Sequence, residues 1–106
     1  MTSDVVALLL TAPDEETGRR IARALVEERL AACVNVHGAM RSTYRWKGQI
    51  ERDAERQIVI KTTKGQLAKL EERLRALHPY ELPEFLVLDA GGSAAYAGWV
   101  AGEVKT

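Results

Sequence analysis

The sequence predicts an α+β fold, and three observations lead to it. Short apolar runs typical of strands alternate with two stretches whose large apolar residues recur at helical spacing. The predicted strands and helices follow the order βαββαβ, the split-βαβ or ferredoxin-like arrangement, with one more helix at the end. The length of 106 residues suits a single domain, residues 1–106.

The first predicted strand and helix are separated by a change of apolar spacing. Residues 5–10 form a continuous apolar run, which is typical of a strand in the middle of a sheet. A helix then begins near Pro13, because the acidic residues after it favour a helix N-terminus. Apolar positions at i, i+4 spacing predict its buried face: Ile21, Ala22, Leu25, Val26 and Leu30.

The middle of the chain predicts a hairpin that is long for its domain. Residues 33–36 and 40–46 form one strand, Lys47-Gly48 is a two-residue turn, and residues 49–62 return. Fully extended, the first strand spans about 46 Å, whereas a chain of this length packs into a body roughly 33 Å across. We therefore expect the tip to project beyond the core unless a bulge bends the ribbon.

The two faces of this hairpin carry different side chains. The turn pairs Trp46 with Gln49, and strand alternation then sorts the other residues. One face carries Met40, Ser42, Tyr44, Trp46, Glu51, Asp53 and Glu55, and the other carries Arg41, Thr43, Arg45, Ile50 and Arg52. Neither resembles a core face, and an isolated ribbon is marginal in water. We expect another subunit to support the hairpin; a hairpin bent back onto its own sheet is the alternative.

The second half of the chain predicts a helix, a strand and a final helix. Thr63 and Gln66 are spaced as a capping box. A leucine stripe follows, Leu67, Leu70, Leu74 and Leu77, and Pro79 ends the helix. Residues 84–88 indicate a short strand. Ser93 then caps a helix marked by Tyr96, Trp99, Val100 and Val104.

Composition argues against several classes of protein. Fifteen basic residues balance fifteen acidic ones, which argues against general nucleic-acid binding. The single cysteine, Cys33, excludes an intrachain disulfide. No apolar run approaches the ~20 residues of a membrane span, and the opening residues lack the basic region of a signal peptide. We expect a cytoplasmic protein without nucleic-acid or membrane partners.

Candidate functional residues gather around the segment HPYELPEF, residues 78–85. His78 is favoured at a helix C-terminus by the dipole alone, so a structural role competes with a functional one. Tyr80, Glu81 and Glu84 lie nearby in sequence. Lys61, at the end of an apolar strand, either extends to solvent or holds an anion.

Metal binding is the other chemistry that the residues permit. The acids Glu51, Asp53 and Glu55 suit a hard or borderline cation, although hairpin acids are usually solvated or paired with arginine. Cys33 is most simply a buried apolar residue. It lies about 13 Å from His37 along an extended strand, too far for one shared metal. No signature of a hydrolase, zinc peptidase, dithiol enzyme or P-loop protein is present, so no enzyme is predicted.

Several segments together resemble the CutA family of divalent-cation tolerance proteins. They are Thr11-Ala12-Pro13, residues 30–36 (LAACVNV), residues 42–51 (STYRWKGQIE), Glu55, residues 60–63 (IKTT) and residues 78–84 (HPYELPE), followed by Tyr96 and Trp99. The resemblance covers nearly the whole chain. It implies a PII-like fold, a homotrimer with hairpins packed between subunits, and a role in tolerance to divalent metals, notably copper. No enzymatic activity is firmly attached to the family, and no cofactor is required.

The resemblance also implies a site in a cleft between subunits. Its lining would be Trp46, Glu55, Lys61, His78, Tyr80 and Glu84, with His78 and Glu55 as the candidate metal ligands. Members taken to bind copper have a cysteine and a second histidine where this chain has Leu10 and Leu77. His37, at a position that is often Ile or Leu in the family, is a candidate replacement donor.

Three functions are open on the sequence alone. A trimeric binding or sensing protein would use His78 and Glu55 as ligands and Lys61 as a charge partner, with Tyr80 and Trp46 as walls. A structural or signalling trimer would use the same residues only to hold its interface. An enzyme would use His78 as general acid or base and Lys61 to stabilise an anion. We rank binding first, the interface second and the enzyme third.

Overall fold

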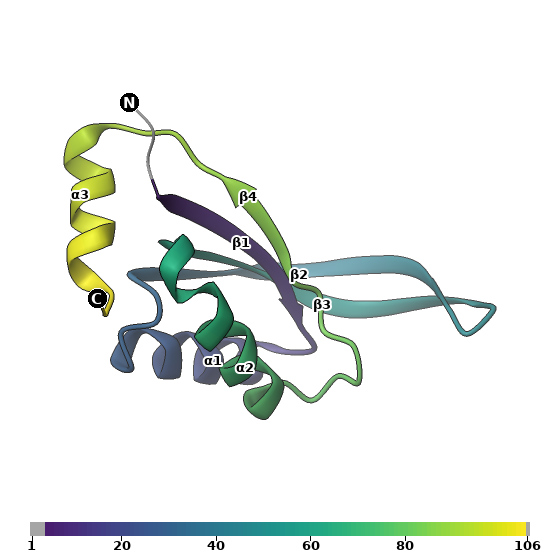
Figure 1. Cartoon of the computed structure of the whole chain (residues 1–106). Coiled ribbons are helices and arrows are strands. Elements are labelled where there is room, and N and C mark those ends of the chain that lie inside the picture. Colours follow the sequence, from purple (N-terminus) through teal and green to yellow (C-terminus); the bar gives the residue numbers. More distant parts are fainter. Residues whose placement is uncertain (1–3, 106) are drawn as a thin grey trace.

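A computed structural model of the chain describes residues 4–105. The elements are β1 (Val5–Ala12), α1 (Glu15–Glu27), β2 (Cys33–Trp46), β3 (Gln49–Thr63), a short 3₁₀ helix η1 (Lys64–Gln66), α2 (Leu67–Leu77), β4 (Leu86–Asp89) and α3 (Ala94–Glu103). The strands form one antiparallel sheet in the order β2-β3-β1-β4 (Figure 1). This confirms the predicted α+β class and the βαββαβ order.

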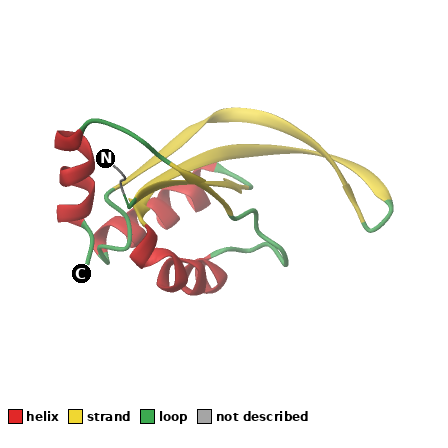
Figure 2. Cartoon of the chain, turned by 45° about the horizontal axis from the view of Figure 1, so that its top comes forward, coloured by secondary structure: helices red, strands yellow, loops and turns green. Residues whose placement is uncertain are grey.

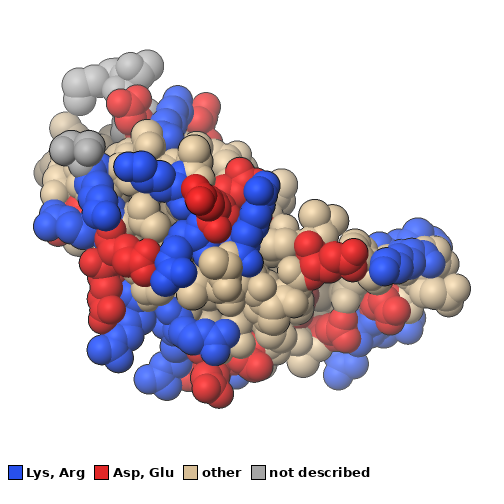
Figure 3. All heavy atoms as spheres, turned by 60° about the horizontal axis from the view of Figure 1, so that its bottom comes forward, with Lys and Arg blue, Asp and Glu red and all other residues tan. Residues whose placement is uncertain are grey.

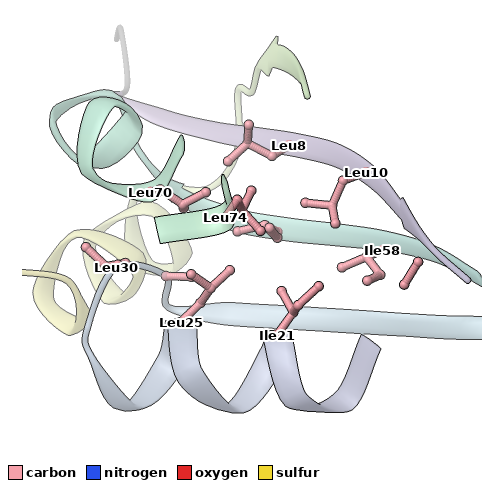
Figure 4. Close-up of a cluster of buried hydrophobic side chains, with 11 residues drawn as sticks. Leu8, Leu10, Ile21, Leu25, Leu30, Ile58, Leu70 and Leu74 are labelled. Carbon is pink, nitrogen blue, oxygen red and sulfur yellow. The ribbon is translucent and has the colours of Figure 1, made fainter. Parts of the chain in front are cut away.

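The hydrophobic core lies between one face of the sheet and the helices α1 and α2. Strand pairing puts Leu8 opposite Ile60 and Leu10 opposite Ile58, so these four side chains share that face. They pack against fully or nearly fully buried side chains from both helices: Ile21, Leu25, Leu70 and Leu74 (Figure 4). The helical spacing of the leucines is therefore confirmed, whereas Val26 of the predicted apolar face is 42% exposed.

Three boundaries differ from the sequence prediction. Thr63 forms no capping bond, because η1 comes first; the side-chain amide of Gln66 instead donates to the Lys105 carbonyl. The helix α1 ends before Leu30, since Arg29 adopts a φ of 60°. The strand β4 begins at Leu86 rather than residue 84. Its last pair with β1 is Leu86–Leu9, and the next carbonyl of β1, that of Leu10, accepts a hydrogen bond from the side chain of Gln57 instead.

The β2–β3 hairpin both projects and bends (Figures 1 and 2). It makes the chain 44 Å long against 25 and 24 Å in the other directions. Lys47 and Gly48 have φ values of 50° and 80°, as a two-residue hairpin turn requires. The predicted register holds from Trp46–Gln49 to Met40–Glu55, then shifts between Val36 and Ala39, where a bulge lies.

The second face of the sheet is not covered by α1 or α2. By strand pairing, an apolar patch on this face, called the open face below, comprises Ala7, Leu9, Val59, Leu86 and Leu88. Leu86 is 54% exposed and Leu88 49% exposed. The helix α3 lies at the end of the sheet where β1 begins (Figure 1), where its Val100 is fully buried. Within residues 4–105, no helix has the length and apolar character that crossing a membrane requires.

Candidate functional site

The predicted site residues that meet in one chain are Glu55, His78 and Tyr80. Glu55 alternates with the core residues of β3, so it points away from α1 and α2, at the base of the projecting hairpin. The helix α2 ends at Leu77, and the segment after it leads Tyr80 to β3. The Tyr80 hydroxyl donates to Glu55 Oε2 at 2.6 Å. Two segments far apart in sequence thus form one polar contact.

Both ring nitrogens of His78 have partners within the chain. Nδ1 accepts from the Tyr80 backbone N–H at 3.2 Å, so the ring proton lies on Nε2, which is 2.6 Å from the Thr11 carbonyl and donates to it. The ring also lies 4.7 Å from that of Tyr80 and is only 7% exposed. His78 therefore fixes the direction in which the chain leaves α2 and positions Tyr80. Metal binding by His78 would require breaking one of these two bonds.

The surroundings of this cluster favour the neutral form of the Tyr80 hydroxyl and provide no ion-pair partner for the Glu55 carboxylate among the described residues. Burial, and then the hydrogen bond to Glu55, raise the pKa of Tyr80 well above its usual range. Glu55 is only 8% exposed. Among the described residues, no Lys, Arg or His lies within 4.0 Å of its carboxylate as an ion-pair partner. Buried acids usually have a cationic or metal partner, so this is an unusual position for a glutamate.

A second phenol–carboxylate pair lies next to the first on the same face of the hairpin. The Tyr44 hydroxyl donates to Asp53, and this bond raises the pKa of Tyr44 to about 12. The charge of Asp53 also contributes to the raised pKa of Tyr80. Strand alternation predicts that Tyr44 and Asp53 share one face, but it did not assign them to the site. Tyr44 is opposite Glu51 and Asp53 is opposite Ser42, so the pair lies diagonally across the ribbon, within reach of a long side chain.

Glu84 approaches the same part of β3 through Gln57. The amide Nε2 of Gln57 donates to the Leu10 carbonyl at 2.8 Å and lies 3.5 Å from Glu84 Oε2. Gln57 is two residues from Glu55 and shares its face. It was not predicted as a site residue, because a glutamine in a strand carries no distinctive sequence signal.

Trp46 and Lys61 lie apart from this cluster in the single chain. Trp46 is at the hairpin tip, paired with Gln49, where Lys47 Nζ lies 5.6 Å from its ring. Lys61 is near the other end of β3, paired with Cys33. Each position is six strand residues from Glu55, about 20 Å. One chain does not bring the six predicted residues together.

A metal centre is likewise not complete in one chain. Among residues 4–105, no three His, Cys, Asp or Glu side chains are grouped so that they could hold a metal ion. Leu10 is fully buried in the core, and Leu77 packs against that core. His37 is exposed at the hairpin bulge. The donors of the single chain therefore do not fit a bound copper ion.

Comparison with known proteins gives a consistent relationship. The family described as CutA1 divalent ion tolerance protein matches residues 6–103. The divalent-cation tolerance protein CutA of Thermus thermophilus is 49% identical over 94 residues, 88% of this chain and 91% of that protein. The crystal structure of CutA from Xylella fastidiosa superposes with a TM-score of 0.93 at 42% identity, covering 97% of this chain and all of that one. The chain spans only 53% of a 38% identical Arabidopsis thaliana relative named Protein CutA, chloroplastic, of which it matches 96 residues, or 90% of its own length.

Proposed function

Because the chain belongs to the CutA1 family of divalent ion tolerance proteins, we propose that it is a homotrimer that binds a divalent metal or a small ligand in a cleft between subunits. One observation carries the proposal. The Glu55 carboxylate is buried, faces away from the core, and has the neutral Tyr80 hydroxyl as its hydrogen-bond partner. A carboxylate in this setting favours a cation or a hydrogen-bonding ligand supplied from outside the chain.

Exposed apolar surface supports the trimer. The strand β4 lies at the edge of the sheet. Its apolar residues Leu86, Val87 and Leu88 are nevertheless between 40 and 54% exposed. An exposed apolar edge strand is a site of association between chains unless it is covered. Leu86 and Leu88 belong to the open face, which also carries Leu9 and Val59, whereas Val87 is opposite Leu8 and lies on the other side of the sheet. The projecting hairpin, which has no core of its own, gains support from a neighbouring subunit.

The separation of the predicted site residues supports a cleft formed by more than one chain. Trp46 is about 20 Å from Glu55 along the hairpin, and Lys61 is about as far in the opposite direction. In the proposed trimer, the hairpin tip of one subunit brings its Trp46 to the cluster of Glu55, His78, Tyr80 and Glu84 of another. Lys61 then has to come from a subunit other than the one that supplies Glu55, because the two residues lie about 20 Å apart within one chain.

The proposed metal role assigns different tasks to the two candidate ligands. Glu55 supplies carboxylate oxygen, which suits hard and borderline divalent cations. His78 binds directly only if it releases Thr11 or Tyr80; otherwise it positions the Tyr80 hydroxyl. Copper stays a candidate cation, with the remaining donors supplied by other subunits, because Leu10 and Leu77 offer none.

A structural or signalling trimer is the second candidate function, and the internally satisfied ring of His78 favours it. In that case Glu55, Tyr80 and His78 hold the interface without a ligand. An enzyme ranks third: the relatives are named as divalent-cation tolerance proteins rather than as enzymes, and His78 and Lys61 would have to meet from different chains. The cytoplasmic location stays a prediction from the sequence.

Light scattering and calorimetry test the proposal. We expect the purified chain to have three times the mass of a monomer, and Cu²⁺ or Zn²⁺ to bind with a signal that Glu55→Gln abolishes. Glu71→Gln is the matched control, because Glu71 is exposed on α2 and pairs only with Arg75. A monomer contradicts the trimer. Unchanged cation affinity in Glu55→Gln contradicts the cleft, and unchanged affinity in His78→Ala removes His78 as a ligand.

A further inference from the structure

The helix α1 leaves part of its apolar surface uncovered. Ala22 and Val26 lie one helical turn apart on its flank, and Val26, which was predicted to be buried, is 42% exposed. Beside them lies Val36 of β2, the edge strand on this side of the sheet. Gly18 lets α1 approach this strand closely, because a Cβ at position 18 would lie 3.1 Å from Val36 Cγ1. Ala22, Val26 and Val36 thus form an apolar strip between the helix and the sheet edge.

The apolar strip is the floor of a hollow in the surface. The hollow has a volume of about 660 Å³ and is open to solvent. Its lining also includes three arginines, Arg19, Arg20 and Arg23, and one acid, Glu16. Figure 3 shows the side of the molecule on which α1 and α2 lie, where basic and acidic groups surround uncharged surface. We call the apolar strip together with the three arginines the α1 groove.

The arginines of the α1 groove are available to carboxylates from outside the chain. Among the described residues, no carboxylate lies within 4.0 Å of Arg20 as an ion-pair partner. Arg19 and Arg23 each pair with a glutamate one turn away along α1, and all four of these side chains are more than half exposed. Exposed pairs of this kind contribute little to stability in water. A carboxylate of another molecule can therefore replace them at small cost.

We propose that the α1 groove is a docking site for an acidic amphipathic segment of another protein. Large apolar side chains of that segment lie on the apolar strip, and carboxylates beside them bind Arg19, Arg20 and Arg23. Arginine suits this role because it binds carboxylate through two parallel hydrogen bonds. A segment that lays its apolar face into a groove is a recurring mode of peptide recognition.

The composition of the α1 groove favours such a segment over other occupants. Nucleic acid needs a basic excess, whereas this chain has no net charge, Glu16 lines the hollow and the floor is apolar. Sites for small molecules enclose most of the ligand, whereas this hollow is open to solvent. A basic or uncharged segment would leave the arginines of the lining without partners.

The α1 groove and the proposed trimer use different surfaces. The trimer uses the open face, β4 and the projecting part of the hairpin, whereas α1 covers the opposite face of the sheet (Figures 1 and 2). The groove therefore stays accessible in the assembled protein. It gives the protein a contact with a further protein, which goes beyond the proposed ligand cleft and does not depend on it.

Fluorescence anisotropy with labelled synthetic peptides tests the inference on the intact protein. The first peptide is an amphipathic helix with leucines on one face and glutamates on the other. The second has serine in place of each leucine, and the third has lysine in place of each glutamate. One protein variant combines Arg19→Glu with Arg23→Glu, and another is Val26→Ser. The matched control combines Lys69→Glu with Arg75→Glu, which makes the same change of net charge at exposed positions of α2.

We expect the first peptide to bind the wild type and the control equally, and to bind each groove variant about tenfold more weakly. We expect the second and third peptides to bind the wild type less tightly than the first. The two groove variants change different parts of the site, so either one suffices if the other does not fold.

Failure of the first peptide to bind the wild type overturns the inference. Equal binding of the serine peptide, or an equal loss of affinity in the control, also overturns it, because either result shows general charge attraction. Heparin binding that the two arginine changes abolish, without binding of the first peptide, assigns the arginines to a polyanion instead. A monomeric wild-type chain overturns the proposed function and leaves this inference in place.

Discussion

Removal of one oxygen atom tests how the Glu55 cluster is held. In Tyr80→Phe, the ring and its packing on His78 stay, but Glu55 Oε2 loses the donor that lies 2.6 Å away. Glu55 is only 8% exposed, so water replaces the donor poorly. A hydrogen bond to a charged group contributes about 1.5–3 kcal/mol. We expect the free energy of unfolding to fall by about 2 kcal/mol per chain, and the thermal midpoint to fall by roughly 9 °C.

The assay is urea unfolding followed by far-UV circular dichroism, with Tyr44→Phe as the matched control. Tyr44 makes the same bond to Asp53, but on the exposed part of the hairpin, where water takes over the role of the hydroxyl. We expect its removal to change stability much less. Glu55→Gln in the Tyr80→Phe background should recover stability, because an amide is less costly to bury than a carboxylate. Equal losses from the two tyrosine variants would refute the buried-carboxylate reasoning.

Three further predictions concern the core, the turn and the tyrosines. Leu74→Ala should cost about 2–5 kcal/mol in urea unfolding, while Leu82→Ala, at a position 70% exposed, should cost almost nothing. Gly48→Ala should lose about 1 kcal/mol from its φ of +80° alone, since no atom lies within 4 Å of the added carbon, whereas Gly65→Ala should be neutral. Both tyrosine pKa values are raised, so between about pH 10 and 12 the unfolded chain releases protons that the folded chain keeps. Stability should therefore fall as the pH rises through this range, and less so in the Tyr44→Phe, Tyr80→Phe double variant.

The hairpin was the part of the fold that sequence reasoning predicted most closely. A Lys-Gly turn that needs positive φ at two positions sets the register, and period-two alternation then sorts every side chain to a face. The bulge between Val36 and Ala39 had no comparable signal. Gly38 lies within it, but glycine in a strand is compatible with several local structures.

Elements whose bounds depend on tertiary contacts were predicted less well. Thr63 has the right residue type and spacing for a capping box, yet the Gln66 side chain is used to hold the segment at Lys105, 39 residues away. The start of β4 is set by the side chain of Gln57 on another strand. Similarly, the Tyr80–Glu55 bond joins residues 25 apart in sequence, a separation that no local pattern encodes.

The effect of a cation on the stability of the trimer shows whether the cation binds at Glu55 or at the exposed hairpin residues Glu51 and Asp53. A cation held in a cleft that exists only in the trimer binds the trimer better than the free chain, so it must stabilise the assembly. At one hundred times its dissociation constant the stabilisation is about 2.7 kcal/mol per site. A cation bound instead to Glu51 and Asp53, which are exposed in the free chain, would bind the free chain as well as the trimer and would leave assembly unchanged. We expect Zn²⁺ to raise the urea concentration of half-dissociation in the wild type and to have no effect in Glu55→Gln. No change in the wild type would place the cation outside the Glu55 cleft.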